Sequence, residues 1–122
     1  MTVSSQLKPF FVRDLKYEGR ITQVAYAASK GAVRSMTLPL ARDLARHNIR
    51  AVTISPGMFT TPLTDTFSER VHHGMLETGT LFPKRYGVPT EFAVTVKWVL
   101  GCPYVNGEVI RLTGGGRLPS RL

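Results

Sequence analysis

Cysteine, acidic residues and long apolar runs are all scarce in this chain. Its one cysteine, Cys102, excludes a disulfide within the chain and is typical of a protein from a reducing compartment. No apolar run approaches the about 18 residues that a helix needs to cross a bilayer. The 122 residues are enough for one domain at most. These absences argue against a disulfide-stapled secreted module and against a membrane-spanning protein.

The scarcity of acids leaves a net charge of +8, from 16 basic and 8 acidic residues. Such a surplus raises the hypothesis of a nucleic-acid or other anionic partner. Four arginines recur at spacings that could share one side of a helix: Arg34, Arg42, Arg46 and Arg50. Asp43 interrupts them, however, and no aromatic residues lie between them to stack on bases. A solvated basic face is the favoured interpretation, and a basic anion- or nucleic-acid-binding module stays an alternative function.

Apolar residues recur mostly every three or four positions from Gln23 to Arg46, which predicts a single long helix with a kink at Pro39. Tyr26 and Lys30 then lie one turn apart on the same face. An ammonium beside a phenol stabilises the phenolate, and this makes a tyrosine a usable acid and base near neutral pH. The Y-x-x-x-K pattern alone is weak, because many helices contain it by chance.

The residues that follow predict a parallel sheet. His47-Asn48 is expected to end the helix, and the β-branched run Ile49 to Ser55 predicts a short buried strand that stops at Pro56-Gly57. A helix joined by a tight turn to a strand is the second half of a right-handed crossover, which implies parallel strands. Thr90 is expected to cap a second helix, and a second strand follows from Glu108 to Leu112.

The long segment from Met58 to Val88 reads as irregular, with one or two short helical stretches. A segment of this length inside a compact domain is typical of a functional lid or binding loop. Its adjacent His72 and His73 lack the spacing of metal ligands and are expected to be exposed. Trp98 is expected in the core or at a subunit interface. Gly114-Gly115-Gly116 follows the last strand and opens no helix, so it cannot serve as a dinucleotide-binding turn.

Four motifs in order carry a family resemblance: Tyr26-Ala-Ala-Ser-Lys30, Ser55-Pro56-Gly57, Thr61, and the run Asn106 to Ile110. Together they resemble the short-chain dehydrogenase/reductase family. The similarity extends from about Tyr17 to Leu118 and corresponds to the C-terminal half of a family member. It implies an α/β fold, the C-terminal half of a Rossmann-like doubly wound parallel sheet whose N-terminal βαβ half is missing. Residues 1–16 are expected not to match the family, 17–122 to form a partial domain, and about 58–88 to form its lid.

The resemblance also implies site residues and an activity. Tyr26 would exchange a proton with a substrate hydroxyl or carbonyl. Lys30 would stabilise the phenolate form of Tyr26 and bind the nicotinamide ribose. Backbone near Phe59 and the hydroxyl of Thr61 would contact the nicotinamide side of NAD, with NADP left open and no metal implied. The function would be oxidation or reduction of a small-molecule hydroxyl/carbonyl pair of the 3-hydroxyacyl-CoA or hydroxysteroid type. The resemblance implies a mitochondrial location, but the N-terminus carries no convincing import signal, so cytoplasm and mitochondrion both stay open.

Two departures from the family pattern qualify that activity. The family's catalytic serine precedes the tyrosine by thirteen residues, where this chain has Arg13, while Ser4 and Ser5 lie too far upstream. The glycine-rich phosphate turn and the family's relay asparagine belong to the half that this chain lacks. We therefore expect a truncated enzyme that is inactive alone and prone to aggregate, because a sheet of two strands leaves edges and one face uncovered. The alternative is a non-catalytic oligomerisation partner of a full-length relative.

Overall fold

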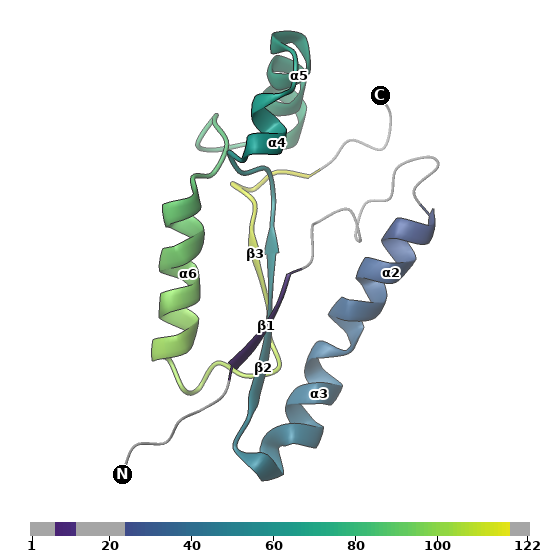
Figure 1. The fold of residues 1–122 in the computed structure, drawn as a ribbon, viewed down its shortest axis with the longest axis vertical. Helices are drawn as coiled ribbons and strands as arrows, with labels where there is room; N and C mark the ends of the chain where they lie inside the picture. The colour runs from purple at the N-terminus through teal and green to yellow at the C-terminus, as the bar shows by residue number, and fades with distance from the viewer. Residues whose placement is uncertain (1–6, 12–23, 118–122) are drawn as a thin grey trace.

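The computed structural model describes residues 7–11 and 24–117, and these residues form a parallel sheet between helices (Figure 1). The sheet has three strands, β1 (Leu7–Phe11), β2 (Arg50–Pro56) and β3 (Val109–Leu112), in the order β1-β2-β3. Both strand pairs are parallel. Figure 1 shows helices α2 and α3 on one side of the sheet and helix α6 on the other. The α/β class and the parallel sheet inferred from the sequence are therefore confirmed.

Strand β1 corrects the expectation of a sheet with two strands. It pairs with β2 in a continuous register, from Leu7 opposite Arg50 to Phe11 opposite Ile54. Pro9 lies inside it, and a proline normally argues against a strand because it cannot donate to the ladder. Within the described residues β1 is at the edge of the sheet, where a proline is tolerated. It lies upstream of the four motifs, so the sheet includes a strand that the motifs did not indicate.

The long helix expected from Gln23 to Arg46 is divided into α2 (Val24–Ser35) and α3 (Thr37–Leu44). The interruption is a single residue, Met36, whose N–H still donates to the Ala32 carbonyl at 3.0 Å. Pro39 explains the position of the break, because it has no N–H to give to the carbonyl of the last residue of α2. The kink predicted at the proline therefore lies one turn earlier.

The end of this helical segment follows the prediction. A short 3-10 helix, η1 (Ala45–His47), is followed by Asn48 in the left-handed conformation, with φ of 56°. The N–H of Asn48 donates to the Ala45 carbonyl at 2.9 Å, and that of Ile49 donates to the Leu44 carbonyl at 3.3 Å. This is a Schellman ending, in which a left-handed residue turns the chain into the following strand.

Replacing Asn48 tests this turn. Asn48→Ala should lower the free energy of unfolding by about 1 kcal/mol, because alanine is strained in the left-handed region and lacks the short polar side chain with which asparagine offsets that strain. Asn48→Gly should change it by only a few tenths of that, since glycine adopts this region freely. Urea unfolding of the two variants is the measurement. Equal losses in both would show that the asparagine side chain, and not the backbone conformation, stabilises the turn.

The two faces of β2 carry different side chains. Val52 and Ile54 form the buried core with Val99 of helix α6 (Pro89–Gly101), and Phe92 and Val96 of α6 pack against it. On the other face the hydroxyl of Thr53 lies 2.6 Å from the hydroxyl of Thr37 in α3, and both residues are buried. This alternation is what a strand covered on both sides requires. The expectation of an uncovered helix-binding face is therefore wrong for β2.

Arg50 also departs from the sequence interpretation, which placed it with the solvated arginines. It opens β2 and is 8% exposed. Its guanidinium donates to four backbone carbonyls at and beyond the end of α6: Val99 at 3.0 Å, Leu100 at 3.1 Å, Cys102 at 2.9 Å and Val105 at 2.9 Å. Helix carbonyls at a C-terminus have no partner within the helix. Arg50 thus supplies that partner and ties α6 to the sheet.

The segment from 58 to 88 contains the short helices α4 (Pro62–Asp65) and α5 (Glu69–Gly79), as the sequence predicted. Figure 1 shows both helices beyond the end of β2, above the edge of the sheet. Within the described ranges, no helix has the length and apolar character required to cross a membrane.

Candidate active site

The carboxyl ends of β2 and β3 are held closely together. The N–H of Gly57, directly after β2, donates to the carbonyl of Leu112 at 2.8 Å. A β-carbon at Gly57 would lie 3.0 Å from the α-carbon of Thr113, so only glycine fits without a backbone shift. This is the edge of a parallel sheet at which open α/β folds bind ligands.

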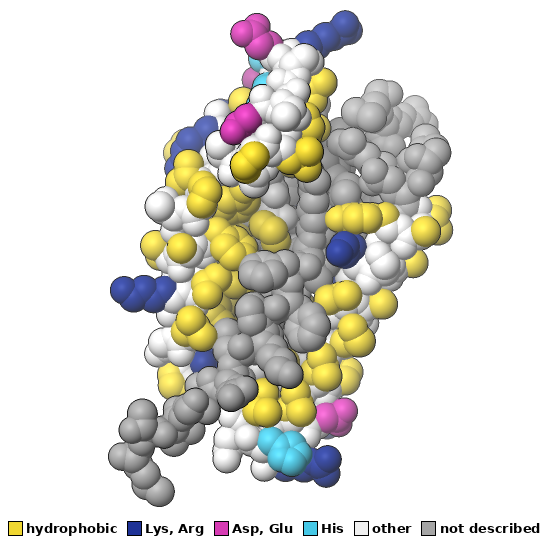
Figure 2. All heavy atoms as spheres, viewed as in Figure 1, with side chains coloured by type: hydrophobic (Ala, Val, Ile, Leu, Met, Phe, Trp, Pro, Cys, Tyr) yellow, Lys and Arg dark blue, Asp and Glu magenta, His cyan; other side chains and the backbone are white. Residues whose placement is uncertain are grey.

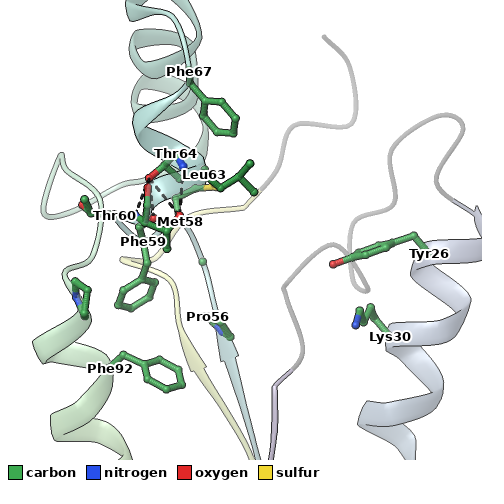
Figure 3. Close-up of a pocket in the computed structure, with 13 residues that line it drawn as sticks. Tyr26, Lys30, Pro56, Met58, Phe59, Thr60, Leu63, Thr64, Phe67 and Phe92 are labelled. Atoms are coloured by element: carbon green, nitrogen blue, oxygen red, sulfur yellow. Dashed lines mark hydrogen bonds between the residues drawn. The ribbon is translucent and has the colours of Figure 1, made fainter.

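A cleft of about 520 Å³ opens at this edge (Figure 3). All four residues predicted to act on substrate or cofactor line it, although they come from two distant parts of the chain: Tyr26, Lys30, Phe59 and Thr61. The rest of the wall is mostly apolar and consists of Pro56, Gly57, Met58, Thr60, Leu63, Thr64, Phe67, Pro89 and Phe92. The structure therefore brings the predicted residues to one site.

Tyr26 and Lys30 face this cleft from helix α2. Figure 3 shows both side chains extending from the helix toward the end of β2. The ammonium of Lys30 lies 5.6 Å from the centre of the Tyr26 ring, within the range of a cation–π contact. Among the residues that the structure describes, the Tyr26 hydroxyl and the Lys30 ammonium have no hydrogen-bond or ion-pair partner. Both groups are thus available to a ligand.

The backbone around Phe59 is fixed by a pairing with Gly87. The N–H of Thr60 donates to the Gly87 carbonyl at 2.9 Å, and the N–H of Gly87 donates to the Met58 carbonyl at 2.9 Å. The N–H of Phe59 itself finds no acceptor in the part of the chain that the structure describes. Its ring meets Phe92 edge-on, with centroids 5.9 Å apart. Phe59 therefore presents an unused backbone donor from a rigid segment.

Thr61 lines the cleft while it begins helix α4. Its hydroxyl oxygen accepts from the N–H of Thr64 at 3.3 Å, and the hydroxyl of Thr64 accepts from the N–H of Thr61 at 2.7 Å. This reciprocal arrangement is a capping box. The Thr61 hydroxyl in turn donates to the Thr64 hydroxyl at 3.4 Å, so it would donate to a ligand only by giving up this long hydrogen bond.

An ion pair attaches the segment after Pro83 to helix α6. Arg85 donates two parallel hydrogen bonds to the carboxylate of Glu91, at 3.0 and 2.7 Å, and the N–H of Val88 donates to the same carboxylate at 2.8 Å. The hydrogen bonds from Arg85 and Val88 lower the pKa of Glu91 to about 2, and the carboxylate raises the pKa of Arg85. The N-cap of α6 is therefore Val88, whose N–H is bound by Glu91, while the predicted Thr90 lies within the first turn after Pro89.

The Arg85–Glu91 pair predicts that the stability of the fold decreases at acidic pH. The folded-state pKa of Glu91 is lowered from 4.5 to about 2, so the stability it contributes is present above pH 4.5 and is lost as the pH falls toward 2. Glu91→Gln should flatten the pH dependence of the melting temperature in that window. Glu69→Gln, on the surface of α5, is the matched control. An identical acid profile for Glu91→Gln and the unmodified chain would show that the pair does not support the fold.

His72 corrects the expectation of two exposed histidines. It is half-buried on α5, and its Nδ1 lies 3.0 Å from the hydroxyl of Tyr86, whose pKa is raised by burial. Its ring also lies 6.0 Å from that of Phe67, while His73 is exposed as predicted. In the described ranges no three His, Cys, Asp or Glu side chains are grouped as metal ligands would be.

Several wall residues were not singled out from the sequence. Phe92 could have been, because it lies among the recurring apolar residues of the helix expected after Thr90. Leu63 and Phe67 are four residues apart but lie in a segment without a clear period, so the sequence carries no comparable signal for them. Arg13, at the position of the family's serine, lies outside the described residues.

Comparisons of this chain with family models and with known proteins point to the same family. The family model described as short chain dehydrogenase matches residues 16–72. This match confirms the resemblance to the short-chain dehydrogenase/reductase family that the motifs predicted. It is similar to 3-hydroxyacyl-CoA dehydrogenase type-2 from Mus musculus, with 50% identity over 102 residues, which cover 84% of this chain and 39% of the mouse protein. The corresponding human protein is 48% identical over the same length.

A solved structure agrees with the sequence matches. The crystal structure of 3-hydroxyacyl-CoA dehydrogenase type-2 from Mycobacterium avium superposes with a TM-score of 0.87 at 38% identity, covering 93% of this chain and 44% of that one. The chain thus spans less than half the length of the relatives that it matches, and its parallel sheet corresponds to part of theirs.

Proposed function

We propose that this chain carries the proton-exchange and nicotinamide-binding side of an NAD(P)-dependent oxidoreductase. The substrate would be the hydroxyl/carbonyl pair of a 3-hydroxyacyl thioester or a hydroxysteroid, with NAD as the first candidate cofactor. The observation that carries the proposal is the cleft at the end of β2, which brings together Tyr26, Lys30, Phe59 and Thr61. The names of the mouse, human and mycobacterial relatives support the hydroxyacyl class.

The residues present fit a nicotinamide and a substrate oxygen. Tyr26 would exchange a proton with the substrate oxygen, and the adjacent Lys30 would stabilise the phenolate form and bind the ribose hydroxyls. The unused N–H of Phe59 is a donor suited to the carboxamide of the nicotinamide, and the hydroxyl of Thr61 would join it by exchanging its long hydrogen bond to Thr64. The cofactor would accept or supply the hydride. The apolar wall around Met58, Phe67 and Phe92 would exclude water from these groups.

The pyrophosphate of a dinucleotide has no corresponding cradle among these residues. Gly114-Gly115-Gly116 follows β3, and the carbonyl of Gly114 accepts hydrogen bonds from the N–H groups of Leu81 and Phe82, both at 3.1 Å. It therefore anchors the lid segment and opens no helix. With Arg13 at the serine position as well, we expect the 122-residue polypeptide to be catalytically inactive by itself.

A chimera tests the proposal directly. The part of the mouse relative that the chain matches would be replaced by the corresponding residues of this chain, starting at Tyr17 so that the relative's own serine segment is retained. Reduction of NAD by the chimera with a 3-hydroxyacyl thioester is the expected result. A folded chimera without dehydrogenase activity, alongside an active parent enzyme, would contradict the proposal.

An exposed apolar face on α6 keeps a second candidate open. Val94 and Trp98 lie one helical turn apart and are 66% and 53% exposed, so Trp98 is not in the core of this chain. Figure 2 shows apolar side chains gathered over this helix. A non-catalytic subunit that joins a full-length relative would bury such a face. Co-purification with the mouse relative, abolished by Trp98→Glu, would support this function, and no complex at micromolar concentrations would oppose it.

A further inference from the structure

Phe59 lies between two hollows of the molecule. The large cleft of about 520 Å³ and a smaller hollow of about 170 Å³ share Met58 and Phe59 in their walls. The rest of the smaller hollow is formed by the end of β3, the segment around Gly87 and the ion pair, through Thr80, Pro83, Arg85, Gly87, Glu91, Leu112, Thr113 and Gly114. The two spaces therefore adjoin at Met58 and Phe59.

Several contacts hold the Phe59 ring in this position. Phe92 meets it edge-on, with an angle of 89° between the ring planes. On the other side the ring occupies the space where a side chain at Gly87 would be, since a β-carbon there would lie 2.7 Å from the Cε1 atom of Phe59. The backbone pairing of Met58 and Thr60 with Gly87 fixes the distance between these segments.

An ion pair links the two segments that contact the Phe59 ring. Arg85 and Glu91 bracket Gly87 in sequence and attach its segment to the first turn of α6, which also carries Phe92. The two residues that confine the Phe59 ring, Gly87 and Phe92, are thus held by the same bidentate contact.

We infer that Phe59 is a specificity-determining partition, which closes the inner end of the cleft and limits the length of the acyl chain that can bind. This inference rests on the proposed function for the identity of the ligand, and on the two hollows for the partition itself. Removal of the ring would join the hollows and admit a longer chain toward Leu112.

Benzene, a small apolar probe, tests the partition without reference to activity. In the unmodified chain, a benzene titration followed by NMR should shift the methyl signals of Leu63, in the large cleft, and leave those of Leu112 unchanged. In Phe59→Ala both sets should shift. Phe82→Ala is the matched control, because Phe82 is 83% exposed and lines neither hollow. Gly87→Ala displaces the ring without deleting it, and should also expose Leu112 to benzene if Phe59→Ala does not fold.

The effect of Phe59 on acyl-chain length is tested by measuring the affinity for two thioesters of N-acetylcysteamine. The shorter is the acetoacetyl thioester and the longer is the 3-oxooctanoyl thioester. Phe59→Ala should raise the affinity for the longer thioester relative to the shorter by about tenfold or more, as expected from burying further methylene groups. Leu112 signals that stay unchanged in both Phe59→Ala and Gly87→Ala would overturn the partition. Binding of benzene near Leu112 in Phe59→Ala, with neither thioester bound by any form, would support the partition and contradict the proposed function.

Discussion

Tyr26→Phe should lower the turnover of the chimera by about 10²- to 10⁴-fold, the contribution expected of a positioned general acid and base. The substitution removes only the hydroxyl, so the ring and its contact with the Lys30 ammonium, 5.6 Å from its centre, remain. The KM for the thioester should therefore change much less than kcat. Formation of the reduced nicotinamide, followed by its absorbance, is the measurement.

Tyr104→Phe is the control for this experiment, because Tyr104 is 99% exposed and lies outside the cleft. It should leave turnover unchanged. A chimera with Tyr26→Phe that retains full turnover would show that another group exchanges the proton, and would remove Tyr26 from the site.

Arg50→Met should cause a large loss of stability, about 3–5 kcal/mol in the free energy of unfolding. The methionine keeps much of the apolar stem but removes the Arg50 donor from four backbone carbonyls around the end of α6. In the described part of the chain, only that of Cys102 keeps another donor, the N–H of Val105 at 3.1 Å. Each buried acceptor that loses its partner costs about 1–3 kcal/mol, and some will recover water. Urea unfolding followed by circular dichroism is the measurement.

Arg42→Met provides the matched comparison, since Arg42 is an exposed arginine on α3. It should change the free energy of unfolding by less than about 0.5 kcal/mol, as surface substitutions usually do. Equal effects of the two arginine substitutions would contradict the role of Arg50 as the hydrogen-bond donor to the C-terminal end of α6.

Local patterns were sufficient to predict most elements of this fold. The helical period around α2 and α3, the β-branched run of β2 and the turn residue Asn48 each carry their signal within a few neighbouring residues. Strand β1 carries no such signal, because Pro9 breaks the pattern and its partner, β2, is about forty residues away in the sequence. Pairing between distant segments determined that strand.

The site shows the same division. Tyr26 and Lys30 could be predicted from the sequence, because a spacing of one helical turn places them side by side. Phe59 and Thr61 followed from the family motif beyond Gly57. The roles of Arg50 and of the Arg85–Glu91 pair depend on contacts between elements. Arg50 consequently read as one of several surface arginines, and Glu91 as part of a helix whose cap was assigned to its neighbour.

The central claim is that these residues bind the nicotinamide end of the cofactor and have no cradle for the rest of it. Calorimetric titration of the 122-residue chain with NAD and with nicotinamide mononucleotide tests this claim most directly. We predict weak binding of both, with dissociation constants within about threefold of each other and both weakened by Lys30→Ala. Binding of NAD more than about tenfold tighter than the mononucleotide, or unaided oxidation of a 3-hydroxyacyl thioester, would contradict the claim.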